Sequence, residues 1–223
     1  MDLARIADLL EPFLCPPPDA GSPIALSQAQ LSKILIYIDV LLKWNAKINL
    51  TAIRDPEEIV TRHFGESLFA ARHIFPQASI NANVIDLGSG AGFPGLPIKL
   101  WARNIKLTLI ESNNKKTTFL REVIRLLALG NVEVFAGRAE AFRGTCDVVT
   151  LRAVERFETA LPTAFNLLKP EGTISLLIGE DQVTSAKAAS PSVRWSAPVP
   201  LPNSQRRILL LGAVNQGSQS SNT

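Results

Sequence analysis

A glycine-rich loop after an apolar run is the strongest chemical signal in the sequence. Residues 84–95 read Val-Ile-Asp-Leu-Gly-Ser-Gly-Ala-Gly-Phe-Pro-Gly. Glycines have no Cβ, so they let backbone N–H groups come close to a ligand, and Pro94 suits the first turn of a helix. A strand, a glycine turn and a helix start together predict a site for the anionic group of a nucleotide cofactor.

Two cofactors compete for this loop. Residues 90–95 match the G-x-G-x-x-G of nicotinamide dinucleotide sites, with Glu111 about 20 residues further on. The predicted strand ends at Leu87, however, so the turn starts at Gly88 and the match fails in that register. The acid-x-Gly-x-Gly-x-Gly pattern of S-adenosylmethionine sites matches residues 86–92 at every fixed position. The register therefore favours S-adenosylmethionine, and an NAD(P)-dependent reductase is the alternative.

The chemistry of S-adenosylmethionine suggests a role for each polar position. Its methionine part is zwitterionic, so its carboxylate needs backbone N–H groups, such as those of Gly88 and Gly90, and its ammonium needs an acceptor such as Asp86. Glu111 ends a second predicted strand, where it can accept hydrogen bonds from both ribose hydroxyls. Ligands of parallel sheets lie at the carboxyl ends of the strands. We therefore expect one crevice to gather the loop at 88–92, Glu111, the turn at 137–140 and the strand end at 151–153.

The elements that must position these residues alternate between strand and helix from residue 83 onwards. Such a series of βα units predicts a mostly parallel, doubly wound sheet, the Rossmann-like α/β fold of class I S-adenosylmethionine-dependent methyltransferases. Two late apolar runs, 192–199 and 206–211, predict a terminal antiparallel hairpin. The predicted strands are 83–87, 106–111, 132–135, 147–151 and 173–178, and the predicted helices are 94–101, 113–129 and 157–168.

A helical region precedes this series. Apolar residues recur at helical spacing between Leu31 and Trp44, after a good N-cap at Ser27. A shorter helix from Leu3 should end at Pro12, and a further helix should start at Asp55. We divide the chain into a helical extension packed on the core (1–80), a methyltransferase core (81–214) and a disordered tail (215–223).

The composition limits the possible functions. A net charge of +3 permits a polyanionic partner without requiring one. Two distant cysteines fit a reducing cytoplasm, and two histidines without clustered thiols do not predict a zinc site. No apolar run approaches the roughly 18 residues of a membrane helix. We therefore expect a cytoplasmic monomer that uses no metal and no membrane.

Several segments together resemble the ribosomal RNA small subunit methyltransferase G family, also called glucose-inhibited division protein B. The resemblance covers about residues 28 to 180. Its most specific part is the Trp-Asn…Asn-Leu-Thr block at 44–51, which is not a general methyltransferase feature. The other segments are His63 with Glu66-Ser67, residues 86–97, 109–120, 131–140 and 151–153.

The resemblance implies methyl transfer from S-adenosylmethionine to N7 of a guanine in 16S ribosomal RNA, which gives N7-methylguanosine. The partner is then 16S ribosomal RNA or the small ribosomal subunit, with the helical extension on the RNA side. Ile178 replaces the family's usual lysine after the fifth strand. If that lysine contacts an RNA phosphate, Arg206 or Arg207 would supply the positive charge in this chain. This departure leaves a non-catalytic RNA-binding module as a second alternative. The cofactor residues that the resemblance carries over are Gly88, Phe93, Ala139, Glu140 and Arg152, with Glu111, Ser112 and Asn113 at the ribose edge.

Methylation of guanine N7 needs no general base, because this nitrogen carries a free lone pair in the neutral base. Proximity and alignment, which are worth up to about 7–11 kcal/mol, then provide the catalysis. We assign no catalytic base and name Arg152, His63 and Asn49 as candidates for positioning. A structural role for His63 is the alternative, and Asn49 would either contact RNA or end a helix.

Overall fold

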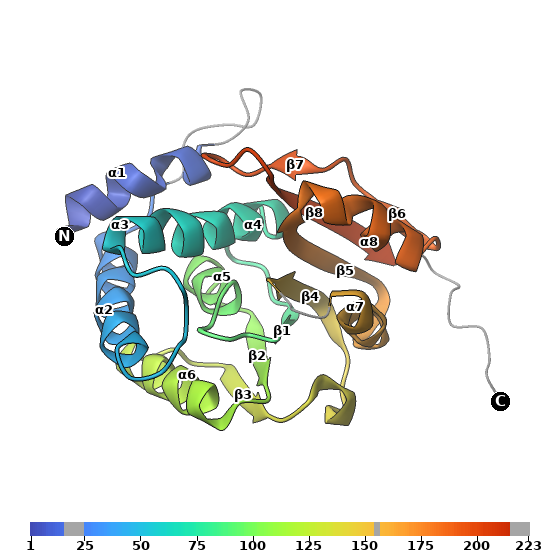
Figure 1. The fold of residues 1–223 in the computed structure, drawn as a ribbon, viewed down its shortest axis with the longest axis horizontal. Helices are drawn as coiled ribbons and strands as arrows, with labels where there is room; N and C mark the ends of the chain where they lie inside the picture. Colours follow the sequence, from blue (N-terminus) through green and yellow to red (C-terminus); the bar gives the residue numbers. More distant parts are fainter. Residues whose placement is uncertain (16–24, 154–156, 215–223) are drawn as a thin grey trace.

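An eight-stranded sheet forms the centre of the protein in the computed structural model (Figure 1). The structure describes residues 1–15, 25–153 and 157–214, so the predicted tail at 215–223 lies outside it. The strand order is β3-β2-β1-β4-β5-β8-β6, and β7 pairs with β8 beside this path. The strands are β1 (Asn83–Leu87), β2 (Lys106–Glu111), β3 (Val132–Ala136), β4 (Cys146–Arg152), β5 (Leu168–Gly179), β6 (Val193–Trp195), β7 (Val199–Pro200) and β8 (Arg207–Val214).

The first five strands run parallel, and the last three run antiparallel to their neighbours. β1 lies between β2 and β4, and β5 follows β4 in the same direction. β8 then pairs antiparallel with β5, and β6 and β7 pair antiparallel with β8. The predicted doubly wound sheet with an antiparallel C-terminal part is therefore confirmed.

Helices cover both faces of the sheet because successive strand residues point to opposite sides. In β1, Val84 packs in one core with α2 (Gln28–Asn45), α5 (Gly95–Trp101) and α6 (Asn114–Leu126). Ile85, the next residue, packs in a second core with α7 (Phe157–Asn166) and α8 (Val183–Ala189). The α8 helix was not predicted, because a short run with few large apolar residues gives little periodicity. Among the described residues, no helix has the length and apolarity to cross a membrane.

The N-terminal helices pack on the first of these cores. They are α1 (Leu3–Leu14), α2, α3 (Pro56–Glu58), a π-helical segment η1 (Ile59–Gly65) and α4 (Glu66–Ile74). The expectation that the first helix ends at Pro12 is wrong, because α1 continues to Leu14. Burial of Phe13 and Leu14 offsets the hydrogen bond that proline cannot donate. The boundary expected at residue 80 falls between the end of α4 and the start of β1.

The predicted start of the long helix is confirmed. Ser27 caps α2 through a capping box: its Oγ accepts from Gln30 N at 3.3 Å, and Gln30 Oε1 accepts from Ser27 N at 2.9 Å. The π-helical segment η1 was not predicted. It continues directly into α4, and such turns are frequent at functional sites. Here η1 carries Arg62 and His63 towards the carboxyl ends of the strands.

Candidate functional site

The glycine loop follows β1 in the register inferred from the sequence. Gly88 is the first residue after the strand and has a φ of 72°, in the left-handed region that favours glycine. The N–H groups of Gly88 and Ser89 both donate to the Ile110 carbonyl, at 3.0 and 3.1 Å. These two bonds fix the start of the loop against β2.

Asp86 anchors the loop from below and is almost fully buried. Its Oδ1 accepts from Thr150 Oγ1 at 2.8 Å and its Oδ2 from Gly95 N at 3.1 Å. Burial raises the pKa of Asp86 to about 6, and the hydrogen bonds limit this rise. Both oxygens bond within the protein, so Asp86 joins β4 to the start of α5.

Glu111 connects the glycine loop to the turn after β2. Its Oε2 accepts from Gly90 N at 2.9 Å and its Oε1 from Asn113 N at 2.8 Å. Asn113 in turn caps α6 by accepting from Lys115 N and Lys116 N. Each oxygen of the Glu111 carboxylate keeps a second lone pair, so the side chain can still accept hydrogen bonds from a ligand.

These segments border a cleft of about 590 Å³ at the carboxyl ends of β1, β2 and β3, which we call the strand-end cleft. The predicted crevice is thus present in its main parts, because parallel strands bring their carboxyl ends to one edge. Ala153, which follows β4, also lines it. Six of the predicted cofactor residues line the cleft: Gly88, Glu111, Ser112, Asn113, Ala139 and Glu140.

The remaining predicted cofactor residues do not line the strand-end cleft. Asp86 and Gly90 support the loop through the hydrogen bonds above. Phe93 is buried between two rings, stacked on Tyr37 at a centroid distance of 5.3 Å and on His63 at 4.6 Å. Tyr37 also donates its hydroxyl to the Ala91 carbonyl. The N-terminal helices therefore hold the far side of the loop.

His63 is fixed on both ring nitrogens. Arg152 Nη1 lies 3.1 Å from Nδ1, and Thr51 Oγ1 lies 2.8 Å from Nε2. Because the guanidinium can only donate, Nδ1 is the acceptor and Nε2 carries the proton. Burial, together with the charges of Arg152 and Arg62, lowers the pKa of His63 to about 3. The ring is therefore neutral at physiological pH and has no free nitrogen to act as a base.

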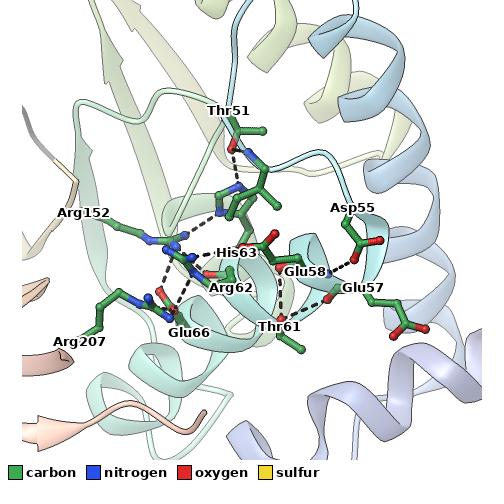
Figure 2. Close-up of polar contacts among 11 residues, drawn as sticks. Thr51, Asp55, Glu57, Glu58, Thr61, Arg62, His63, Glu66, Arg152 and Arg207 are labelled. Carbon is green, nitrogen blue, oxygen red and sulfur yellow. Dashed lines mark hydrogen bonds and ion pairs between the residues drawn. The ribbon is translucent and has the colours of Figure 1, made fainter. Parts of the chain in front are cut away.

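Arg152 belongs to a buried ionic network and not to the cleft. Its Nη2 donates to Glu66 Oε2 at 3.0 Å and to the Arg62 carbonyl at 2.6 Å. Arg207 Nε donates to the other oxygen, Glu66 Oε1, at 2.8 Å. Figure 2 shows these side chains converging on Glu66 from three directions. We call Arg62, Glu66, Arg152 and Arg207 the Glu66 cluster.

The Trp-Asn…Asn-Leu-Thr block forms the end of α2 and the turn that follows it. Asn45 closes the end of α2: its Oδ1 accepts from Leu50 N and Thr51 N, and its Nδ2 donates to the Thr51 carbonyl. Asn49 is exposed. The helix-ending role considered for Asn49 therefore falls to Asn45, and the side chain of Asn49 is accessible to a partner.

Sequence reasoning missed two residues that hold the site. Tyr37 is the only tyrosine of the chain and lies fully buried within an apolar helix stripe. A lone phenol in such a stripe suggests a specific partner, which here is the loop carbonyl of Ala91. Glu66 was noted only as part of a motif, and its burial with three guanidinium groups depends on long-range contacts.

Comparison with known proteins identifies the family. Residues 30–201 match the family model described as rRNA small subunit methyltransferase G. The chain belongs to this family. A relative from Xylella fastidiosa (strain M23), named Ribosomal RNA small subunit methyltransferase G, is 40% identical over 158 residues, which are 70% of this chain and 72% of the relative. One of the same name from Oceanobacillus iheyensis is 32% identical over 86% of this chain and 87% of the relative.

The family resemblance seen in the sequence is thus confirmed, and with it S-adenosylmethionine as the cofactor of this methyltransferase family. Solved structures support the fold. TYW2 of P. horikoshii in complex with MeSAdo has a TM-score of 0.59 at 19% identity, over 76% of this chain and 66% of that one. TYW2 of M. jannaschii in complex with AdoMet has a TM-score of 0.56 at 18% identity, over 75% and 78%.

Proposed function

We propose that this protein transfers a methyl group from S-adenosylmethionine to N7 of a guanine in 16S ribosomal RNA. The coarser part, methyl transfer to ribosomal RNA of the small subunit, follows from membership of the family. The acceptor atom is the finer part of the proposal. The two free thiols, Cys15 and Cys146, agree with the expected action in the reducing cytoplasm.

The observation that carries the proposal is the strand-end cleft beside a glycine loop in the correct register. Gly88 begins this loop with a positive φ, and six predicted cofactor residues line the cleft. Glu111 is held by two backbone N–H groups with one lone pair free on each oxygen, an arrangement suited to the two hydroxyls of a ribose. We assign the ribose edge to Glu111, Ser112 and Asn113, and the adenine side to Ala139 and Glu140.

The supporting loop has a separate role in this proposal. S-adenosylmethionine, when bound, supplies a methyl group activated by a positively charged sulfur. Phe93 keeps the loop in place through its stacking on Tyr37 and His63, and Asp86 fixes the loop from the strand side. These residues position the loop and do not move protons.

His63 is neutral and both of its ring nitrogens are hydrogen-bonded, which agrees with a reaction that needs no general base. The lone pair at guanine N7 is available without deprotonation. The protein therefore has to align the acceptor nitrogen with the methyl group and to exclude other orientations. We propose Arg152 and His63 as positioning residues that act through the loop and the Glu66 cluster.

The deciding experiment maps N7-methylguanosine in 16S ribosomal RNA from cells with and without the gene. We expect one guanine to lose its modification in the deletion strain and to regain it when the wild-type gene returns. A Gly88→Val gene should fail to restore it, because the variant cannot form the loop. Persistence of every N7-methylguanosine in the deletion strain would contradict the proposed acceptor.

A further inference from the structure

The Glu66 cluster contains more positive charge than its carboxylate can neutralise. Glu66 lies within ion-pair distance of three guanidinium groups: Arg152 at 3.0 Å, Arg207 at 2.8 Å and Arg62 at 3.7 Å. Within the cluster, one negative and three positive charges leave a net charge of +2, of which the Glu58 carboxylate, 3.2 Å from Arg62, offsets one. His63 adds none, because its ring is neutral.

The three arginines differ in how far they reach the solvent. The Arg152 side chain is 10% exposed and donates to Glu66, His63 and the Arg62 carbonyl, so it is the buried partner. The Arg62 and Arg207 side chains are 37% and 32% exposed. These two arginines carry the surplus charge at the accessible side of the cluster.

Arg62 and Arg207 each have N–H groups that make no hydrogen bond within the described part of the protein. Arg207 directs its Nε and Nη2 at Glu66 Oε1, and the hydrogen bonds among the described residues do not use its Nη1. Arg62 Nη1 donates to Glu58, which is 46% exposed. Arg62 Nε is buried without a hydrogen-bond partner in the described part of the chain. Its carboxylate neighbour is Glu66 Oε1 at 3.7 Å. Because buried polar groups usually have hydrogen-bond partners, the protein holds Arg62 less completely than it holds Arg152.

The cluster lies next to the proposed methyl-donor site. Arg152 ends β4, and Arg207 stands opposite Gly179 at the end of β5. The cluster therefore sits at the carboxyl ends of β4 and β5, and the residue after Arg152, Ala153, lines the strand-end cleft. His63 connects the two places. It forms a hydrogen bond with Arg152, as Figure 2 shows, and it stacks on Phe93 of the glycine loop.

We propose that Arg62 and Arg207 bind a backbone phosphate of the substrate RNA, with Glu66 and Arg152 as their buried support. Guanidinium groups match phosphate oxygens in geometry and charge. A phosphate would offset the surplus charge, which a neutral base edge could not do. A guanine methylated at N7 is itself cationic and would be repelled here, so the cluster is suited to the backbone beside the target nucleotide. This inference rests on the proposed function.

The test compares RNA affinity across salt concentrations for the wild type and for Arg207→Gln, Arg62→Gln and Arg194→Gln. Arg194 is the matched control, because it is exposed on β6 and pairs with Ala213 at the other end of β8. The probes are two short labelled RNAs of equal length, one of uridines only and one with a single guanine. Fluorescence anisotropy gives the affinity of the full-length protein for each probe.

Loss of one phosphate contact lowers the salt slope of log K by about 0.7 for single-stranded RNA. We therefore expect Arg207→Gln and Arg62→Gln each to bind both probes about fivefold more weakly near 0.1 M salt, and to approach the wild type near 1 M. Arg194→Gln should keep the wild-type slope. Arg207→Lys, which retains the charge, should also keep it, and this separates lost charge from disturbed folding.

Two results would overturn the phosphate site. One is a wild-type salt slope in both glutamine variants of the cluster. The other is a loss confined to the guanine-containing probe, which would indicate reading of the base edge. Methylation of 16S ribosomal RNA by the wild type is measured separately. A wild type that binds through the cluster but leaves N7 unmodified would refute the proposed function and leave the phosphate site standing.

Discussion

Replacement of Glu66 by glutamine should destabilise the fold far more than replacement of an exposed glutamate. The Glu66 side chain is 2% exposed, and the change raises the net charge of its cluster from +2 to +3 without changing its shape. Removing one partner of a buried ion pair costs about 3–5 kcal/mol, because the remaining charge is buried and uncompensated. In a chain of this length, each kcal/mol lowers Tm by about 2–4 °C. The expected fall in Tm is thus about 6–20 °C.

Glu57 provides the control for this measurement. It also pairs with an arginine, Arg5, at a comparable distance of 2.7 Å, but both side chains are about half exposed, at 48% and 49%. Glu57→Gln should leave the urea midpoint and Tm unchanged within error, since exposed pairs contribute little. Glu66→Asp keeps the charge and should lose less stability than Glu66→Gln. Equal urea midpoints for Glu66→Gln and Glu57→Gln would refute the reasoning that burial makes the cluster costly to break.

Three further outcomes are expected. Gly88→Val should abolish S-adenosylmethionine binding in calorimetric titration, because a β-branched residue does not adopt a φ of 72°. The control is Gly130→Val, which should keep the wild-type affinity because Gly130 has open space around it. A wild-type Kd in both variants would disprove the assignment of the loop to the cofactor. Tyr37→Phe should lower the free energy of unfolding by about 1 kcal/mol through the lost bond to Ala91, and unchanged chemical denaturation would show that this bond contributes nothing. His63 has a folded-state pKa of about 3, below its ordinary value of 6.5. Between these two values the unfolded chain binds one proton more than the folded protein. The free energy of unfolding should therefore fall as the pH falls from 6.5 to about 3, by about 1.36 kcal/mol per pH unit. Asp86, whose folded-state pKa is raised to about 6, has the opposite effect on stability between its ordinary pKa and about 6. The measurement is therefore the difference in unfolding free energy between the wild type and His63→Gln at each pH. A difference that does not change with pH would contradict the buried neutral ring.

The central strands and the glycine loop could be predicted closely from the sequence. Strands β1 and β2 have the expected bounds, because apolar runs stand between polar or glycine residues. Because Gly88 directly follows the last strand residue, Leu87, the loop matches the S-adenosylmethionine pattern and not the dinucleotide pattern. These features depend on local sequence and on one general property of parallel sheets, namely that their ligands lie at the carboxyl ends of the strands.

The direction of Arg152 could not be predicted in this way. A side chain at the end of a strand can point to either side of the sheet edge, and here Glu66 on α4 attracts it away from the strand-end cleft. Glu66 and Arg207 are 141 residues apart in the chain, so no local pattern relates them. Asn45 was likewise not distinguished from Asn49, since both stand near the helix end and only the fold buries one of them.

Arg207 is synthesised much later than the other three residues of the Glu66 cluster. Synthesis proceeds from the N-terminus, and Arg207 stands at the start of the last strand, β8, which is inserted between β5 and β6. A nascent chain that has already placed Glu66 beside Arg152 still lacks its third guanidinium until β8 has emerged and paired. The Glu66 cluster therefore cannot be complete before β8 has been made and has paired, so a chain truncated before β8 would contain the glycine loop but lack one arginine of the cluster.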